Sequence, residues 1–407
     1  MLSRILFIIP IWAILDLYFF QTLRNLAESL HPNLRYTLLW AYWLFDLALI
    51  LLMLYLIFIQ PDALASKHTF LLISLIFLSL LPKLLVFPFL LLEDLSRLIS
   101  YFVQQKTGTG FPERRKFISQ LIFGISTIPF GAILYGITKG KYNYKVHRST
   151  LYFKDLPDNF DGFTITQLSD IHCGSFTDHE AVEHGVNLAN KQQSDLIVFT
   201  GDLVNNEAKE LDEWQSTFAR LKAPHGVYSI LGNHDYGDYI AWPSPQTKKE
   251  NLERLKAMQK EMGFRLLLDE HVKIEKDGQF INLVGIQNWG AKGFAQYGDL
   301  HKAMFTVAPN TFTVLLSHDP SHWEAQALQH PKPIHLSLAG HTHGMQFGVE
   351  VPGFKWSPVK YIYKQWAGVY RKGFQYLNVN RGFGFIGFSG RVGIWPEISV
   401  ITLKKGS

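Results

Sequence analysis

The sequence predicts an all-α bundle of membrane-spanning helices followed by an α/β domain with a layered fold. The first 140 residues hold long apolar stretches, whereas the remainder alternates short runs rich in Val, Ile and Phe with polar segments of helical length. These runs end in polar and glycine-rich residues, as strands do where a layered α/β fold carries its functional site. We expect a bundle at residues 1–138, a linker at 139–160 and the α/β domain at 161–407.

Four stretches are apolar enough to cross a bilayer, which takes about 20 residues each. They cover residues 5–23, 36–59, 69–92 and 117–137, and they lack the polar face of a surface-packed helix. Asp16, Asp46 and Lys83 lie within them. Two accounts of these charges are open: pairing inside a small bundle, or snorkelling near helix ends, which is the simpler of the two.

The orientation of the bundle stays open because two groups of basic residues compete. The loop before the fourth stretch would be cytoplasmic by the positive-inside tendency, but the residues after that stretch favour the opposite orientation. The first group is Arg97, Lys106, Arg114, Arg115 and Lys116, and the second is Lys139, Lys141, Lys145 and Arg148. The segment ERRKFISQLIFGIS fits both a twin-arginine export signal and an ordinary basic anchor.

Composition excludes some functions. The net charge of +5 is spread without a basic stripe, so nucleic acid is not expected as a partner. Cys173 is the single cysteine, which excludes an internal disulfide and a zinc–thiolate cluster. It is expected to be a small packed residue.

Polar side chains follow five predicted strands, at the point where each strand ends. Helices are expected between and after the first three strands, over residues 178–192, 207–222 and 247–262. Because the carboxyl ends of strands gather at one edge of a layered α/β fold, we expect these side chains to meet there. They are Asp170 and His172 in FTITQLSDIHCG, Asp202 in DLIVFTGDLVNN, Asn233 in GVYSILGNHDYG, His318 in FTVLLSHDP, and His341 and His343 in IHLSLAGHTHG.

This set of carboxylates, amide and imidazoles suits divalent Mn, Fe or Zn, with Mn²⁺ favoured. Seven ligands exceed what one ion that also holds water needs, so two ions sharing a carboxylate are expected, about 3.5–4 Å apart. Each residue alone has an ordinary structural explanation, such as a helix N-cap for Asp170 or Asp202. Five such clusters at five strand ends favour the metal interpretation. Gly201, Gly232 and Gly340 are expected to let the backbone turn behind the ligands.

The order D-x-H, GD, GNHD, a histidine after a strand, and GHTH resembles the calcineurin-like metallophosphoesterase superfamily over about residues 160–405. The segment NRGFGFIGFSGRVGIWPEISVITL (380–403) is similar to that of a branch of membrane-associated bacterial phosphodiesterases. The resemblance implies a layered β-sandwich flanked by helices. It also implies one ion held by Asp170, His172, Asp202 and His343, and a second held by Asp202, Asn233, His318 and His341.

Asp202 is therefore the expected bridge and a catalytic residue. His234 is expected to donate a proton to the leaving oxygen or to stabilise charge there. Asp235 either orients His234 or forms a structural turn. Asn233 and Arg381 are expected to contact substrate, Arg381 as a planar fork on a phosphate, although a surface salt bridge explains this arginine nearly as well. Many relatives carry Asp where this chain has Asn205, which would change the tuning of a neighbouring histidine.

The expected function is a membrane-anchored phosphodiesterase or pyrophosphatase for a phosphate-containing lipid or envelope precursor. The resemblance extends to enzymes that cleave UDP-2,3-diacylglucosamine in lipid A synthesis. Two alternatives remain: a phosphodiesterase for soluble substrates whose membrane part is a tether, and a non-catalytic membrane sensor. Residues 289–305 and 354–370 mix aromatic side chains with lysines, which fits anionic headgroups or packing on the core. We expect a multi-pass protein of the bacterial inner membrane; the side of its catalytic domain and its oligomeric state stay open.

Overall fold

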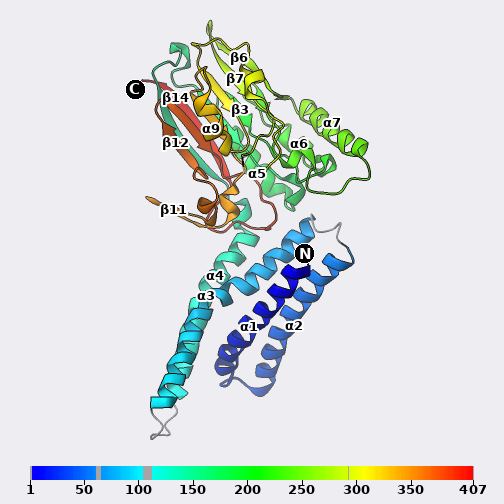
Figure 1. Cartoon of the computed structure of the whole chain (residues 1–407), viewed down its shortest axis with the longest axis vertical. Coiled ribbons are helices and arrows are strands. Elements are labelled where there is room, and N and C mark those ends of the chain that lie inside the picture. Colours follow the sequence, from blue (N-terminus) through cyan, green and yellow to red (C-terminus); the bar gives the residue numbers. More distant parts are fainter. Residues whose placement is uncertain (1, 61–65, 104–111, 292, 407) are drawn as a thin grey trace. The chain divides into compact units, whose positions relative to one another are not determined.

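The computed structural model describes residues 2–60, 66–103, 112–291 and 293–406. The chain divides into two compact units, one holding most of the N-terminal helices and the other holding the residues from Thr138 on (Figure 1). The N-terminal helices are α1 (Leu2–Ala27), α2 (Pro32–Phe58), α3 (Lys67–Val103) and α4 (Pro112–Thr138). Each of the four predicted spans lies almost entirely within one of them.

Three segments of the described chain are long and apolar enough to cross a membrane: Pro32–Phe58, Lys67–Ser96 and Lys116–Thr138. A crossing by α1 stays a prediction. Lys106, which bears on the orientation of the bundle, lies outside the described residues.

A buried ion cluster joins the first three helices. Nζ of Lys83 lies 2.6 Å from Oδ1 of Asp16 and 2.6 Å from Oδ2 of Asp46, and it also donates to Oγ of Ser79. Tyr42 adds a hydrogen bond from its hydroxyl to Asp16. The three charged residues are 2–5% exposed, so snorkelling is the wrong account and pairing is the right one. The helices bring the charges together in the interior of the bundle, where pairing stabilises them.

Replacing Lys83 with methionine is expected to lower the free energy of unfolding by about 3–5 kcal/mol, because two buried carboxylates then face each other without a cation. Thermal unfolding of the full-length protein in detergent measures the loss. The triple variant Lys83→Met, Asp16→Asn, Asp46→Asn removes the charges together and is expected to recover most of the stability. Equal melting of wild type and Lys83→Met would contradict the predicted role.

Two six-stranded sheets form the described part of the second unit, with a separate two-stranded hairpin of β10 (Val349–Val351) and β11 (Phe354–Trp356). The first sheet has the order β1 (Lys145–Phe153), β14 (Glu397–Lys405), β2 (Thr164–Leu168), β3 (Leu196–Phe199), β4 (Val227–Ser229) and β5 (Phe264–Leu266). The second has the order β12 (Gly368–Lys372), β13 (Gln375–Val379), β9 (Leu336–Ala339), β8 (Thr313–Leu316), β7 (Gln279–Gly285) and β6 (Glu270–Lys276).

The two sheets pack face to face, and helices cover their outer faces. Ile165 and Val198 of the first sheet share one buried core with Leu283 and Leu338 of the second. The first sheet packs its other face on α5 (His179–Asn190), α6 (Gln215–Phe218) and α7 (Pro245–Glu261), and the second on α8 (Leu300–Met304) and α9 (Ser321–Ala325). The predicted layered sandwich with flanking helices is confirmed.

Two local expectations differ from the structure. Part of the segment predicted as a linker is β1, which pairs in parallel with β14 along its whole length and buries Leu151 and Phe153. The helix predicted over 207–222 is instead two short pieces, a 3₁₀ turn at Ala208–Leu211 and α6. Ala208, Leu211 and Trp214 are buried at a spacing of three, which favours 3₁₀ winding over an α-helix.

Candidate metal centre

The seven predicted ligands follow five strands of the two sheets. Within the first sheet β2, β3 and β4 run parallel, as do β8 and β9 within the second, so their carboxyl ends share an edge. Loops at these ends are joined by backbone hydrogen bonds, such as Asp170 N–H to the Gly201 carbonyl and Gly340 N–H to the His318 carbonyl. The structure therefore brings all seven side chains to one place, where they form two groups.

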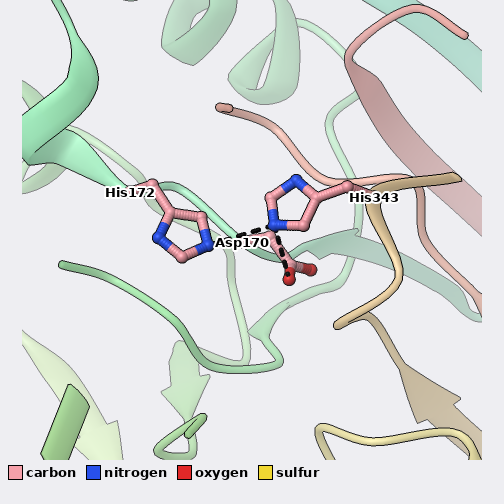
Figure 2. A group of neighbouring side chains, drawn as sticks. All are labelled: Asp170, His172 and His343. Atoms are coloured by element: carbon pink, nitrogen blue, oxygen red, sulfur yellow. Dashed lines mark hydrogen bonds and ion pairs between the residues drawn. The ribbon is translucent and has the colours of Figure 1, made fainter. Parts of the chain in front are cut away.

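Asp170, His172 and His343 form the first group, and Figure 2 shows their polar atoms converging. Nε2 of His172 lies 3.0 Å from Nε2 of His343. Nε2 of His343 lies 3.3 Å from Oδ1 of Asp170. All three residues are buried, and one potential ligand atom of each lies within 4.8 Å of the others.

Asp202, His318 and His341 form the second group, again with their ligand atoms within 4.8 Å of one another. Asn233 belongs to the same cluster, because its Oδ1 lies 3.1 Å from Nε2 of His318 and 2.8 Å from Nδ1 of His341. The amide nitrogen of Asn233 donates to the hydroxyl of Tyr239 at 2.8 Å. That bond turns the amide oxygen toward the histidines.

Asp202 lies between the two groups. Its Oδ2 is 3.5 Å from Nε2 of His172 in the first group and 3.1 Å from Nε2 of His318 in the second. Its other oxygen, Oδ1, accepts the backbone N–H of His234. A carboxylate in this position has the geometry of a bridge between two ions.

Five of the seven candidate ligands have left-handed backbone conformations, which side chains with a Cβ rarely adopt. The φ angles are 51° at Asp170, 49° at His172, 61° at Asp202, 70° at His341 and 51° at His343. Strain of this kind persists where the surrounding structure enforces it, and it concentrates at functional sites.

Glycines support these turns in two ways. Gly201 has φ 94°, so it turns the backbone as expected. Gly340 instead permits close approach: a Cβ there would meet Oδ2 of Asp170 at 2.2 Å, and one at Gly232 would meet Oδ1 of Asp202 at 2.2 Å. The expectation of a sharp turn thus holds for one glycine, and the other two make room for the carboxylates.

Burial and nearby carboxylates shift the pKa values of the candidate histidine ligands. Burial lowers the pKa of His172 to about 3 and that of His341 to about 4, so both rings are neutral and offer a lone pair. Burial also opposes charge on His318, but the carboxylates of Asp202 and Asp170 outweigh it and raise its pKa to about 10. The carboxylates that favour a proton on His318 also favour a divalent cation at the same place. The donor set therefore fits a metal centre.

Comparisons with known proteins agree with this chemistry. A family described as calcineurin-like phosphoesterase matches residues 163–345, and one described as a probable calcineurin-like phosphoesterase transmembrane domain matches residues 3–141. The metallophosphoesterase YkuE of Bacillus subtilis strain 168 is 30% identical over 258 residues, which cover 61% of this chain and 82% of YkuE. The chain is a calcineurin-like metallophosphoesterase. It has a transmembrane domain, and its catalytic domain is that of a hydrolase of phosphoric ester bonds.

A second relative and a solved structure are also similar to parts of this chain. A transmembrane protein with a metallophosphoesterase domain from Danio rerio is 29% identical over 282 residues, and the chain spans 60% of that protein's length. Among solved structures, the phosphopantetheinyl hydrolase PptH of Mycobacterium tuberculosis is 14% identical, and the match covers 49% of this chain and 89% of that one. Its TM-score of 0.31 is too low to support an argument about function.

His234 of the metallophosphoesterase lies beside the candidate ligands. Its ring stacks edge-on against His172, with 5.0 Å between centroids, and lies 4.4 Å from the ring of Tyr239. Its Nδ1–H donates to the backbone carbonyl of Asn205 at 2.8 Å. The main chain of Asn205 supplies this acceptor, so the hydrogen bond to His234 does not depend on the side chain at position 205. The side chain of Asn205 instead favours the charged form of His172, against the larger effect of burial on the pKa of that ring.

Asp235 has a structural role and does not contact the ring of His234 among the hydrogen bonds of the described residues. Its carboxylate accepts the backbone N–H groups of Asp202 at 2.9 Å, Leu203 at 2.8 Å and Gly232 at 2.8 Å, with Val204 at 3.3 Å. Asp235 therefore ties the loop after β3 to the loop after β4.

Arg381 is buried and pairs with two carboxylates, Glu397 through Nη1 and Glu350 through Nη2. Arg381 therefore forms salt bridges, as the alternative prediction for this residue had it, but they are buried and not on the surface. Contact with substrate stays a prediction. Arg391 belongs to the segment 380–403 but was not predicted as a site residue. It is a fully buried arginine whose Nη2 donates to the carbonyl of Gly384 at 2.6 Å and lies 3.3 Å from Nδ1 of His343. It packs the C-terminal loop against that histidine.

Tyr363 and Asp319 also support the site without having been predicted. The Tyr363 hydroxyl lies 2.9 Å from Nε2 of His341 and donates to Oδ2 of Asp319 at 3.3 Å. Such a partner fixes the orientation and tautomer of a ligating ring. Asp319 directly follows His318 in the sequence, and this was the one indication that it lies at the site. Tyr363 is far in sequence from the strand ends that carry the predicted ligands, except His341 and His343.

Replacing Tyr363 with phenylalanine is expected to weaken divalent-metal affinity by about 10–100-fold, because Nε2 of His341 loses its hydrogen bond to the hydroxyl. Oδ2 of Asp319, at 3.6 Å, then stays as its nearest polar neighbour among those described. Titration of metal-depleted protein with Mn²⁺ measures the change. Tyr361→Phe, a neighbouring and 75% exposed tyrosine, is the matched control and is expected to bind as wild type does. Identical affinities of both variants would show that the hydroxyl does not orient His341.

Proposed function

We propose that this metallophosphoesterase is a dinuclear phosphodiesterase or pyrophosphatase that acts on a lipid-linked phosphate ester or anhydride at the membrane. The observation that carries the proposal is the pair of ligand groups with Asp202 between them. One ion would be held by Asp170, His172, Asp202 and His343. The second would be held by Asp202, Asn233, His318 and His341, and Mn²⁺ is the favoured metal, with Fe or Zn as alternatives.

Two such ions, when bound, lower the pKa of coordinated water and polarise the phosphoryl oxygens of a substrate. The protein holds their ligands in place before substrate arrives. His318 donates Nδ1–H to the carbonyl of Thr200 at 2.7 Å, which leaves Nε2 as the ligand atom. His341 is held on its outer side by Tyr363, so its Nδ1 is the ligand atom.

His234 supplies the proton for the leaving oxygen. With Nδ1–H donated to the Asn205 carbonyl, Nε2 is the atom that carries the transferable proton. The carbonyl also stabilises the positively charged ring by accepting from it. His234 is half-buried, so substrate can reach it, whereas Asp170, His172 and His318 are fully buried.

The membrane domain supports a lipid-linked substrate, because it confines the catalytic domain to the vicinity of a bilayer. A UDP-2,3-diacylglucosamine type of molecule is the specific candidate. Its pyrophosphate offers two phosphoryl groups for the ions, and its acyl chains keep it in the bilayer. The bacterial inner membrane is the proposed location.

The experiment compares substrates with the full-length protein reconstituted in nanodiscs. Metal-depleted protein is loaded with Mn²⁺, Zn²⁺ or Fe²⁺ and given bis(p-nitrophenyl) phosphate, p-nitrophenyl phosphate, UDP-glucose and UDP-2,3-diacylglucosamine. The proposal expects diester or pyrophosphate hydrolysis that needs metal and favours the lipid-linked compound. Equal rates on UDP-glucose would support the soluble-substrate alternative. Metal binding without hydrolysis of any compound would support a sensor.

Reporters fused to the C-terminus show on which side of the membrane the catalytic domain lies, and therefore which substrates it can meet. A fluorescent protein that matures only in the cytoplasm and a phosphatase that is active only after export are fused in turn after Ser407. A cytoplasmic signal is the expected result for a nucleotide-linked lipid. A signal from the exported phosphatase would exclude that substrate class.

A further inference from the structure

The β10–β11 hairpin turns an apolar face outward. Val351 pairs with Phe354 and Val349 with Trp356, and directly opposite residues of antiparallel strands share a face. On this face Val349 is 48% exposed, Val351 53% and Phe354 57%. Neither strand pairs with either of the two sheets, and β11 stands out from them in Figure 1.

The polar residues of the hairpin contact the rest of the domain. Glu350 lies opposite Lys355. Glu350 forms an ion pair with the buried Arg381, and Nζ of Lys355 donates to the carbonyl of Ala367. The hairpin therefore exposes three apolar side chains on one face, where a surface strand pair usually exposes polar ones.

Further exposed apolar side chains flank the strands. Together with those of the hairpin they form what we call the hairpin surface: Met345, Val349, Val351, Phe354, Tyr361 and Ile362, all 48–75% exposed. Exposed apolar residues gathered in this way mark an interaction site more often than an ordinary surface.

The charge around the hairpin surface is positive. Glu350 is the one acidic residue between positions 345 and 372, and it shares the guanidinium of Arg381 with Glu397. Lys360 and Lys364 are the exposed basic residues that flank Tyr361 and Ile362, and Nζ of Lys364 lies 3.9 Å from a carboxylate oxygen of Glu324. Arg371 and Lys372 lie at the other end of β12, opposite Tyr376 and Gln375. A surface with apolar residues at its centre and basic residues beside them is typical of proteins that bind the interface of an anionic bilayer.

The hairpin surface is built on the turn that carries two candidate ligands. Ser357 donates from Oγ to the carbonyl of Gly344, directly after His343. Tyr363, which follows Ile362, contacts His341. The segment that exposes the apolar side chains is therefore fixed to the metal centre by short hydrogen bonds.

We propose that the hairpin surface inserts into the headgroup region of an anionic bilayer and presents the metal centre to lipid-linked phosphates there. The second half of this proposal rests on the proposed function, and the first half does not. Val349, Val351 and Phe354 enter the interface, while Lys360 and Lys364 contact lipid phosphates. A substrate anchored by acyl chains then meets the site without leaving the membrane.

A fluorescence experiment on the full-length protein tests the membrane contact without any catalysis. Cys173 is buried, so a nitrobenzoxadiazole label attaches selectively to an introduced cysteine in Phe354→Cys. Phe305→Cys, at an 80% exposed phenylalanine of another surface, is the matched control. Both are reconstituted in phosphatidylcholine bilayers with and without phosphatidylglycerol, alongside lipids carrying a nitroxide quencher.

A blue-shifted emission and strong quenching at position 354, increased by phosphatidylglycerol and absent at position 305, are the expected results. Equal emission and quenching at both positions would overturn the proposal. A shift at position 354 that follows protein density rather than lipid charge would also overturn it, in favour of contact with a second copy of the chain.

A second measurement joins the surface to catalysis. Phe354→Asp is expected to lower kcat/KM for a lipid-linked substrate by about tenfold or more, because a charge opposes insertion, and to leave hydrolysis of bis(p-nitrophenyl) phosphate unchanged. Phe305→Asp is expected to change neither. Insertion of the label combined with a wild-type protein that hydrolyses no lipid would refute the proposed substrate and leave the membrane contact intact.

Discussion

Replacing Asp202 with alanine is expected to lower kcat/KM for a phosphodiester by at least about 10³-fold. Catalytic groups that act as one unit show losses of this size when one member is removed. Oδ2 of Asp202 lies 3.5 Å from Nε2 of His172 and 3.1 Å from Nε2 of His318, so its removal affects both groups. Bound metal is expected to fall with activity. Steady-state rates on bis(p-nitrophenyl) phosphate and elemental analysis of the purified protein measure the two effects.

Two further variants make the Asp202 experiment specific. Asp202→Asn keeps the shape of the side chain, so a similar loss there excludes misfolding as the cause. Asp212→Ala removes a carboxylate that is 48% exposed and pairs with Arg254, and it is expected to behave as wild type. Full activity and metal content in Asp202→Ala would overturn the assignment of the bridge.

Replacing His234 with glutamine is expected to lower kcat by about 10²–10⁴-fold while metal content stays at the wild-type level. Among the hydrogen bonds of the described residues, the ring of His234 donates to the Asn205 carbonyl, and the backbone N–H of His234 donates to Asp202. Loss of the ring therefore removes the proton donor and leaves the candidate ligands in place.

The dependence on leaving group separates proton donation from a structural role of His234. Nitrophenolate leaves without a proton, whereas an alkoxide needs one, so the loss is expected to be larger for an alkyl diester than for a nitrophenyl diester. His301→Gln, at an exposed histidine, is the matched control. Equal losses on the two substrates, or loss of metal, would argue that His234 only supports the fold.

Local patterns determine much of the fold and therefore made it predictable. The runs that end in Asp170, Asp202 and His341 are short, apolar and followed by glycine-rich turns, and each is a strand with its polar residues at the expected end. The segment 139–160 looked like a linker because strand β1 buries only two of its nine side chains. Its pairing with β14 links residues about 250 positions apart, which no local pattern reveals.

The same distinction explains what was predicted of the site. Seven side chains at five strand ends could be placed together, since parallel strands bring their carboxyl ends to one edge. The positions of Tyr363 and Arg391 at the site could not be predicted, because each residue lies in a loop whose path depends on the finished fold. Lys83 shows the same limit in the bundle, where only the packing of three helices decides between pairing and snorkelling.

The carboxylate of Asp235 has a consequence for how ions would load. It binds N–H groups of the loop that carries Asp202 and of the loop that carries Asn233, so these two loops cannot shift independently. An ion that orders one loop therefore orders the ligands of the other ion as well. Occupancy of the two positions is expected to rise together along a single steep isotherm, and half-loaded protein is expected to be scarce at every metal concentration.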